Sequence, residues 1–262
     1  MSTNRIKLVV AYDGTDFCGW AANPGTRTVQ GTLTDVIREL DPSVEEVVGA
    51  SRTDSGTHAR GQVCHFDTFN PMPATKWAEV LNRQLPLDLK VSRSTAVTKR
   101  FHSRFCADSR EYRYRIRTGP PNPFEDRYAF QTPQPLRVSR MEIAAKNLVG
   151  KHDFRAFTEE LDESVENTVR TLHSVEVRFS GSTVSIKVIG TAFLRGMMRR
   201  ISGALFQIGR GNRDMDYIKR LLDESTRDGE TWPVVLPARG LTLVRVRYAN
   251  PLVDVREKTV FP

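Results

Sequence analysis

Residues 112–117 alternate aromatic or apolar side chains with arginine, in the order Tyr-Arg-Tyr-Arg-Ile-Arg. A repeat of two is typical of a β-strand, because successive side chains point to opposite faces of the sheet. One face of this strand is expected to pack against a core, and the other carries positive charge. The segment therefore predicts a sheet with one packed face and one cationic face.

Strand and helix patterns follow one another along the rest of the chain. Strand patterns lie at residues 6–12, 44–50, 62–66, around Val91, and at 169–179, 184–189 and 241–248. Helical spacing of apolar residues predicts helices at residues 29–40, 75–83, 139–148 and 193–208. We therefore predict an α+β fold in two domains, residues 1–105 and 106–262.

The charge is concentrated in two windows. The chain of 262 residues has 39 Lys and Arg against 31 Asp and Glu, a net charge of +8. Residues 99–117 hold seven basic and two acidic residues, and residues 191–213 hold five arginines and no acid. Arginine binds phosphate through two parallel hydrogen bonds, so two such windows indicate a polyanionic partner such as nucleic acid. The alternative is that both are solvated faces.

Several other classes of protein are disfavoured. No run approaches the ~18 apolar residues of a membrane helix, and the N-terminus has no signal-peptide pattern, so we expect a cytoplasmic protein without membrane attachment. Three cysteines, far apart, argue against a disulfide framework. His58, Cys64 and His65 have no evident fourth ligand and lie on a loop and on alternating faces of one strand, which argues against zinc.

The densest polar signal is the loop that contains Asp54. Arg52, His58 and Arg60 lie close to Asp54 in the sequence, and nearby positive charge lowers the pKa of a carboxyl group. An ionised carboxylate on a loop at a strand end is suited to act as a nucleophile or base. The alternative is structural, since Asp-Ser-Gly is a good turn sequence whose Asp side chain caps its own backbone.

Two further segments place arginine among aromatic or apolar residues. Residues 101–114 interleave aromatic residues with arginine, as base stacking and phosphate contact require, or they form a strand with core aromatics and a solvated face. The helix expected at 193–208 carries Arg195, Arg199 and Arg200. These side chains are aimed at a buried acid or at phosphate, or their stems cover apolar surface on an amphipathic helix.

These segments together form a series of motif blocks. The blocks are Tyr-Asp-Gly-Thr-Asp-Phe-Cys-Gly-Trp at 12–20, Thr-Val-Gln-Gly at 28–31, Arg-Thr-Asp-Ser-Gly-Thr-His-Ala at 52–59, Phe-His-Ser-Arg-Phe at 101–105, Ser-Arg-Glu-Tyr-Arg-Tyr at 109–114, His-Asp-Phe at 152–154, Thr-Val-Arg at 168–170, Phe-Leu-Arg-Gly-Met-Met-Arg-Arg-Ile-Ser-Gly at 193–203 and Gly-Leu-Thr-Leu at 240–243. In this order, over nearly the whole chain, they resemble the tRNA pseudouridine synthase A (TruA) family. Ser51, Thr57 and Ala21 depart from the residues usual in that family, which are Gly, Val and Gln, and none of the three changes removes a reacting group.

The resemblance implies a fold and an activity. The fold is two α+β domains whose sheets join into one extended, mainly antiparallel sheet, with the active-site cleft between the domains. The activity is isomerisation of uridine to pseudouridine at positions 38, 39 and 40 in the anticodon stem-loop of tRNA, by a homodimer that needs neither a cofactor nor a metal.

The resemblance also implies a role for each of four residues. Asp54 is the essential carboxylate, which either attacks C1′ or takes a proton from C2′. Tyr112 stacks on the uracil, and its hydroxyl helps to remove the C5 proton. Arg199 pairs with Asp54, and Arg52 fills the space left by the flipped base or holds its phosphate.

Two other functions compete with this one. The first is a catalytically silent tRNA-binding protein that uses the same basic surface. The second is an N-glycosidase, which would release free uracil and leave abasic RNA.

Overall fold

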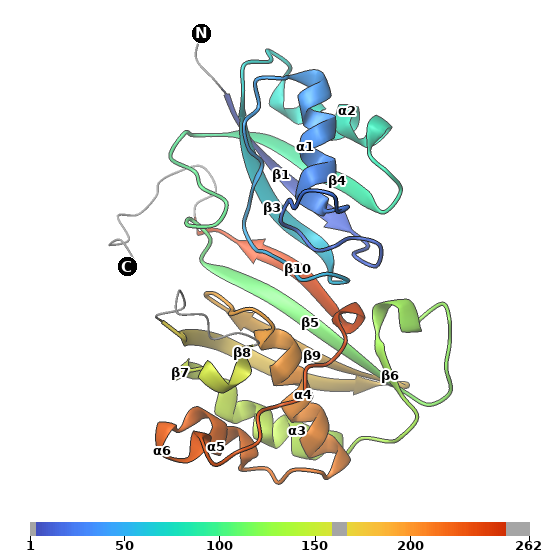
Figure 1. The fold of residues 1–262 in the computed structure, drawn as a ribbon, viewed down its shortest axis with the longest axis vertical. Coiled ribbons are helices and arrows are strands. Elements are labelled where there is room, and N and C mark those ends of the chain that lie inside the picture. Colours follow the sequence, from blue (N-terminus) through green and yellow to red (C-terminus); the bar gives the residue numbers. More distant parts are fainter. Residues whose placement is uncertain (1–3, 159–166, 250–262) are drawn as a thin grey trace. The chain divides into compact units, whose positions relative to one another are not determined.

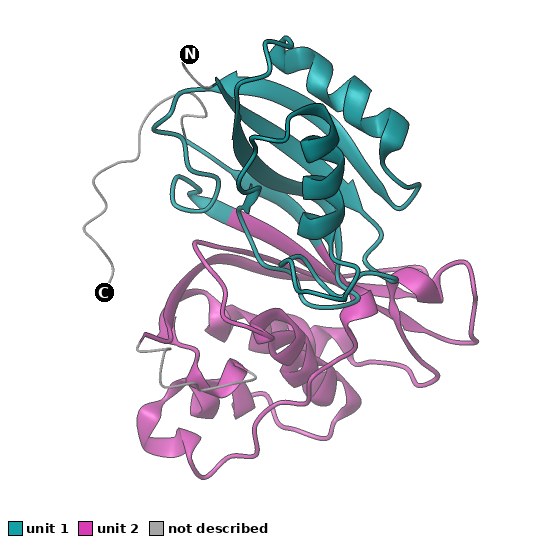
Figure 2. Ribbon diagram, turned by 45° about the horizontal axis from the view of Figure 1, so that its top comes forward, with its two compact units in different colours: residues 1–109, 243–262 teal, residues 110–242 magenta. Residues whose placement is uncertain are grey.

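The structure is a computed structural model that describes residues 4–158 and 167–249. It divides into two compact units (Figure 2), one built from the described residues up to Ser109 and from Leu243 on, the other from Arg110 to Thr242. The fold is mixed α+β, and its strands pair mostly antiparallel, which confirms the predicted fold class. The domain boundary at residues 105 and 106 stays a prediction. In the structure, the strand at the C-terminal end of the described chain is grouped with the first unit.

The described residues of the first unit form a sheet with the helices α1 and α2 packed on it (Figure 1). Its strands follow the order β4 (Leu89–Val97), β1 (Asn4–Tyr12), β3 (His58–Thr68) and β10 (Leu241–Arg247), and the short β2 (Val48–Gly49) pairs with β3. Ile6, Leu8 and Val10 on alternate positions of β1 are buried, as a strand with one packed face requires.

The helices of this unit bury one apolar face each. Helix α1 (Val29–Leu40) is capped by Thr28, whose side chain accepts a hydrogen bond from the Gly31 N–H. The helix buries Val29, Leu33 and Ile37. Helix α2 (Trp77–Gln84) follows a short 3-10 turn at Ala74–Lys76 and buries Trp77 and Leu81.

The described part of the second unit has four antiparallel strands, one short parallel strand and four α-helices. The strands follow the order β5 (Ser109–Thr118), β9 (Thr183–Gly190), β8 (Val169–Ser180) and β7 (Gly150–Asp153), and the short β6 (Phe130–Thr132) pairs parallel with β5. The helices are α3 (Val138–Ala145), α4 (Met197–Arg210), α5 (Tyr217–Leu222) and α6 (Glu224–Arg227). Further 3-10 turns lie at Asp126–Tyr128, Lys146–Leu148, Arg155–Phe157 and Ala238–Gly240.

Strand β5 confirms the two-faced strand predicted at residues 112–117. Tyr112, Tyr114 and Ile116 are buried, whereas Arg113 and Arg115 are half-buried. Arg117 departs from the prediction, because it is buried in ion pairs with Asp126 and Glu125. Strand β9 repeats the pattern: its apolar residues at even-numbered positions 184–188 are fully buried, and the polar residues between them are not. One face of this sheet is therefore packed and the other is polar.

Two expected elements differ from the structure. The strand expected at 44–50 is reduced to β2, because side chains from α1 take its carbonyls: Arg38 donates to the carbonyl oxygens of Val44 and Glu45, and Gln30 donates to that of Val47. The helix expected from residue 193 begins at Met197 instead. Gly196 precedes it in the left-handed conformation, with φ of 69°, which ends any regular helix before that point.

A search of the described residues for a helix long and apolar enough to span a membrane finds none.

Candidate active site

The Asp54 loop connects β2 to β3 in the first unit. At its start, the Ala50 N–H donates to the Val63 carbonyl at 2.8 Å. Next to this pair, the fully buried Gln62 amide bonds the Ser51 backbone on both sides: its Nε2 donates to the Ser51 carbonyl at 2.6 Å, and its Oε1 accepts from the Ser51 N–H at 3.3 Å. The loop therefore leaves the sheet at a point fixed by a buried side chain.

Asp54 opens a β-turn. The Thr57 N–H donates to the Asp54 carbonyl at 3.1 Å, and Gly56, the third residue of the turn, has φ of +76°. A positive φ at this place is the mark of a type II turn, which favours glycine. The turn that the structural interpretation of Asp-Ser-Gly predicts is thus present in the backbone. The Asp54 side chain is half-buried, and its catalytic role stays a prediction.

The N-terminal motif braces this loop. The Trp20 N–H donates to the Thr53 carbonyl at 3.0 Å, and the Gly56 N–H donates to the Phe17 carbonyl at 3.3 Å. The Tyr12 hydroxyl lies 2.8 Å from Thr53 Oγ1 in a buried hydrogen bond. The segment at residues 12–20 and the loop therefore form one hydrogen-bonded assembly.

His58 belongs to this assembly as the first residue of β3. Its ring is 4% exposed, and Nδ1 accepts a hydrogen bond from the Gly14 N–H at 3.0 Å and lies 3.1 Å from Asp13 Oδ1. Arg52 and Arg60, in contrast, are exposed. His58 thus fixes the end of the loop, and the two arginines supply positive charge at the surface on either side of it.

Thr57 supplies a first testable prediction. Its side chain is 1% exposed, and its hydroxyl is buried without a hydrogen-bond partner among the described residues. A buried unsatisfied hydroxyl costs about 1–3 kcal/mol. We expect Thr57→Val, which restores the residue usual in the TruA family, to stabilise the protein by about 1 kcal/mol and to raise Tm by ~3 °C in calorimetry.

Thr57→Ser is the matched control, since it keeps the hydroxyl and loses only the methyl group. It is expected to lower Tm. A Tm for Thr57→Val below that of the wild type would show that the hydroxyl stabilises the loop.

Tyr112 lies on β5 in the second unit, with 5% of its surface exposed. Its ring contacts Phe193 edge-to-face, with 4.9 Å between the centroids and 74° between the planes. Phe193 was expected in a helix, but it lies just before α4 and fixes the orientation of the Tyr112 ring.

Arg199 lies in the first turn of α4. Its Nε donates to the Leu236 carbonyl at 2.7 Å, and the neighbouring Arg200 donates to the Pro233 carbonyl at 2.7 Å. The Tyr114 hydroxyl donates to the Pro237 carbonyl oxygen at 2.7 Å. Burial raises the pKa of this tyrosine. These bonds hold the segment before the last 3-10 turn in place, so the arginines of α4 do more than cover apolar surface.

The four predicted site residues are thus divided between the two units. Arg52 and Asp54 share one loop of the first unit, and Tyr112 and Arg199 belong to the second. Sequence reasoning missed two supporting groups, the Gln62 amide and the Leu236 carbonyl. Gln62 belongs to the Gly-Gln-Val sequence at 61–63, which follows the motif at 52–59 as in the TruA family, so its place in the sequence was a usable signal. A backbone carbonyl such as that of Leu236 leaves no signal in the sequence.

The described residues hold no cluster of three or more His, Cys, Asp or Glu side chains arranged to bind a metal ion.

Comparison with known proteins identifies the class. A family model described as tRNA pseudouridine synthase matches residues 8–106 and 144–249. Two relatives, both named tRNA pseudouridine synthase A, come from Geobacillus kaustophilus and Bacillus licheniformis. The first relative is 40% identical to this chain, over 95% of this chain and 96% of the relative's own length. The second is 39% identical, over 94% of this chain and 100% of the relative's own length. An archaeal box H/ACA sRNP Nop10–Cbf5 complex is more distant, 12% identical over 77% of this chain and 44% of that one, with a TM-score of 0.33.

The chain belongs to the tRNA pseudouridine synthase family. The predicted resemblance is thereby confirmed.

Proposed function

We propose that this protein isomerises uridine to pseudouridine at positions 38, 39 and 40 in the anticodon stem-loop of tRNA. The observation that carries the proposal is Asp54, a half-buried carboxylate on a turn that is braced by the N-terminal motif and by Gln62. Catalysis requires such bracing, because a reacting group must be held in place before the substrate arrives.

The reaction exchanges one bond to the ribose for another. The N1–C1′ bond of uridine breaks, the uracil turns, a C5–C1′ bond forms, and the C5 proton is lost while N1 gains a proton. The target base must leave the helical stack first. Asp54 either attacks C1′, to give a covalent intermediate, or takes the C2′ proton, to give a glycal.

The other three residues act around this carboxylate. Tyr112 presents an oriented aromatic ring for the uracil and a hydroxyl for the C5 proton. Arg52, exposed two residues before Asp54, fills the space left by the flipped base or holds its phosphate. The pairing of Arg199 with the Asp54 carboxylate, which the TruA resemblance implies, would keep that group ionised and stays a prediction.

The biological setting belongs to the same proposal. We infer a cytoplasmic protein, because its tRNA substrate is found there, and a homodimer as in the TruA family. The chemistry assigned to Asp54 and Tyr112 uses neither a metal nor a cofactor.

The test uses an unmodified tRNA transcript with uridines at positions 38 to 40. It is incubated with the protein, a chelator and no cofactor, and pseudouridine is mapped by carbodiimide adducts that stop primer extension. Stops at those positions support the proposal. Tight binding without stops would identify a silent tRNA-binding protein, and release of free uracil would identify an N-glycosidase.

Tyr112→Phe tests the role of the hydroxyl. The ring of the variant still packs against Phe193 and still stacks, so tRNA affinity should stay within about twofold, whereas turnover should fall by about 10²-fold for loss of a general acid–base group. Single-turnover kinetics and filter binding measure the two effects. Wild-type turnover in this variant would remove the hydroxyl from the mechanism.

A further inference from the structure

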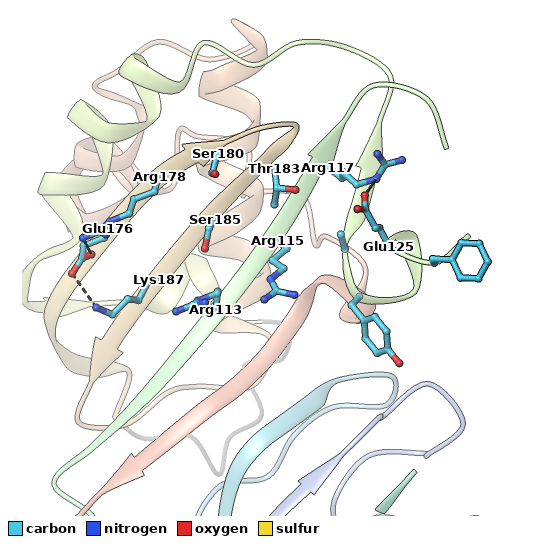
Figure 3. Close-up of a pocket in the computed structure, with 13 residues that line it drawn as sticks. Arg113, Arg115, Arg117, Glu125, Glu176, Arg178, Ser180, Thr183, Ser185 and Lys187 are labelled. Atoms are coloured by element: carbon cyan, nitrogen blue, oxygen red, sulfur yellow. Dashed lines mark hydrogen bonds and ion pairs between the residues drawn. The ribbon is translucent and has the colours of Figure 1, made fainter. Parts of the chain in front are cut away.

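A basic groove lies on the polar face of the sheet in the second unit. The cavity has a volume of about 640 Å³ and is lined mainly by β5, β9 and β8 (Figure 3). Its β5 residues, Arg113, Arg115 and Arg117, alternate with Tyr112 and so point to the opposite face of the strand. The groove is therefore not made of the residues assigned to the reaction.

The strand register arranges the lining side chains in rows. Across the three strands the rows are Arg113–Lys187–Glu176, Arg115–Ser185–Arg178 and Arg117–Thr183–Ser180. Directly opposed residues of paired strands have Cβ atoms about 5 Å apart. The groove floor is therefore a compact array of cations and hydroxyl groups with one carboxylate, that of Glu176, and all of these residues lie on regular strands.

Positive charge exceeds negative charge in this array. Five basic and two acidic residues line the groove. Glu176 pairs with Lys187 at 3.1 Å and with Arg178 at 3.0 Å. Arg117, which is only 6% exposed, pairs with Asp126 at 2.8 Å and with Glu125 at 3.4 Å, so Arg113 and Arg115 carry most of the excess charge. Arg113 and Lys187 are opposite each other, and like charges in that position destabilise a sheet. The acids that line the groove do not balance its basic residues, and this excess of positive charge favours an anionic ligand.

The surroundings of the groove favour RNA over a small anion. Phe124 and Tyr128, which also line the cavity, are exposed by 88% and 39%. Exposed rings stack on unpaired bases, while arginine and hydroxyl side chains contact phosphate and sugar. A second copy of the chain fits less well, because a two-fold interface would place this excess of positive charge against itself.

We propose that the groove binds the sugar–phosphate backbone of the tRNA, as a docking surface separate from the reacting groups. This inference rests on the proposed function, since it takes the substrate to be tRNA. The groove positions the RNA and carries no chemical step.

The test is the double variant Arg115→Gln, Arg178→Gln. Loss of two phosphate contacts is expected to weaken tRNA binding by about tenfold at 0.1 M salt, and to reduce the slope of log K against log salt by about 1.4 to 1.8. The tRNA concentration for half-maximal rate should rise in parallel. Arg115→Lys, Arg178→Lys keeps both charges and should restore most of the affinity. The matched control is Lys146→Gln, Lys219→Gln, which removes two exposed cations outside the groove and should change neither quantity.

The outcomes separate this inference from the proposed function. If the wild type forms pseudouridine but the double variant binds tRNA with unchanged affinity and salt slope, the docking surface is wrong and the proposed function stands. If sedimentation shows that the double variant changes only the oligomeric state, the groove is an interface between copies and the inference is overturned. Thermal melting verifies that the variant is folded.

Discussion

Asp54→Ala is expected to reduce pseudouridine formation by about 10⁴-fold or more, because no other group of the loop supplies a carboxylate in its place. The affinity for tRNA should stay within about threefold, since one carboxylate contributes little to binding a polyanion. The turn should also survive, because its closing bond runs between the backbones of Asp54 and Thr57. Single-turnover kinetics, filter binding and thermal melting measure the three quantities.

Asp54→Asn refines this result, since it keeps the shape of the side chain and removes its charge. Loss of activity in both variants assigns the effect to the ionised carboxylate. Asp35→Ala is the control, because Asp35 is an exposed acid on α1, and it should leave the rate unchanged. Residual activity above about one per cent in Asp54→Ala would mean that another group carries out the reaction.

The sequence predicted well those helices and strands in which apolar and polar side chains follow a regular spacing. Helix α1 begins and ends where its apolar spacing indicated, at Val29 and Leu40, with a capping threonine before it. Strand β5 has the two faces that alternate Tyr and Arg implied. In both cases burial of one face is enough to determine the conformation, and that information is contained in a few neighbouring residues.

The sequence was less informative where distant groups decide the conformation. The strand expected at 44–50 was wrong in extent, because Arg38 and Gln30 occupy its carbonyls. Strands β6 and β7 and helices α5 and α6 are too short for a periodic signal. The same limit applies to the site. Asp54 was identifiable as a motif residue, but its bracing by Trp20 and Phe17 depends on contacts more than thirty residues apart.

Gly14→Ala is expected to disable the enzyme although Gly14 has no reacting group. A Cβ atom at this position would lie 2.0 Å from the carbonyl oxygen and 2.5 Å from the carbonyl carbon of Thr57. Both are backbone atoms of the turn that begins at Asp54, so no side-chain rotation relieves the clash. The turn must move, and the hydrogen bond from the Gly14 N–H to His58 weakens with it.

The size of the effect follows from the precision that catalysis needs. Displacement of a reacting group by about 1 Å costs about 10² in rate, and overpacking of this kind costs about 1–3 kcal/mol of stability. We therefore expect a fall of about 10²-fold or more in single-turnover rate and ~5 °C in Tm. The affinity for tRNA should be largely retained, because the basic groove proposed to bind tRNA belongs to the second unit, whereas this turn belongs to the first.

Gly229→Ala is the matched control, because it adds the same methyl group as Gly14→Ala at a position where that group causes no clash. At Gly229 a Cβ atom would be 3.5 Å from its nearest neighbour, the Thr226 carbonyl oxygen, which is ordinary contact. Gly229→Ala should therefore keep the wild-type rate and Tm. If Gly14→Ala retained full activity, the turn would be able to shift without consequence, and Asp54 would not depend on its bracing. A loss of rate confined to Gly14→Ala, in a protein that still melts cooperatively and binds tRNA, would mean that the N-terminal motif acts by positioning the turn that carries Asp54.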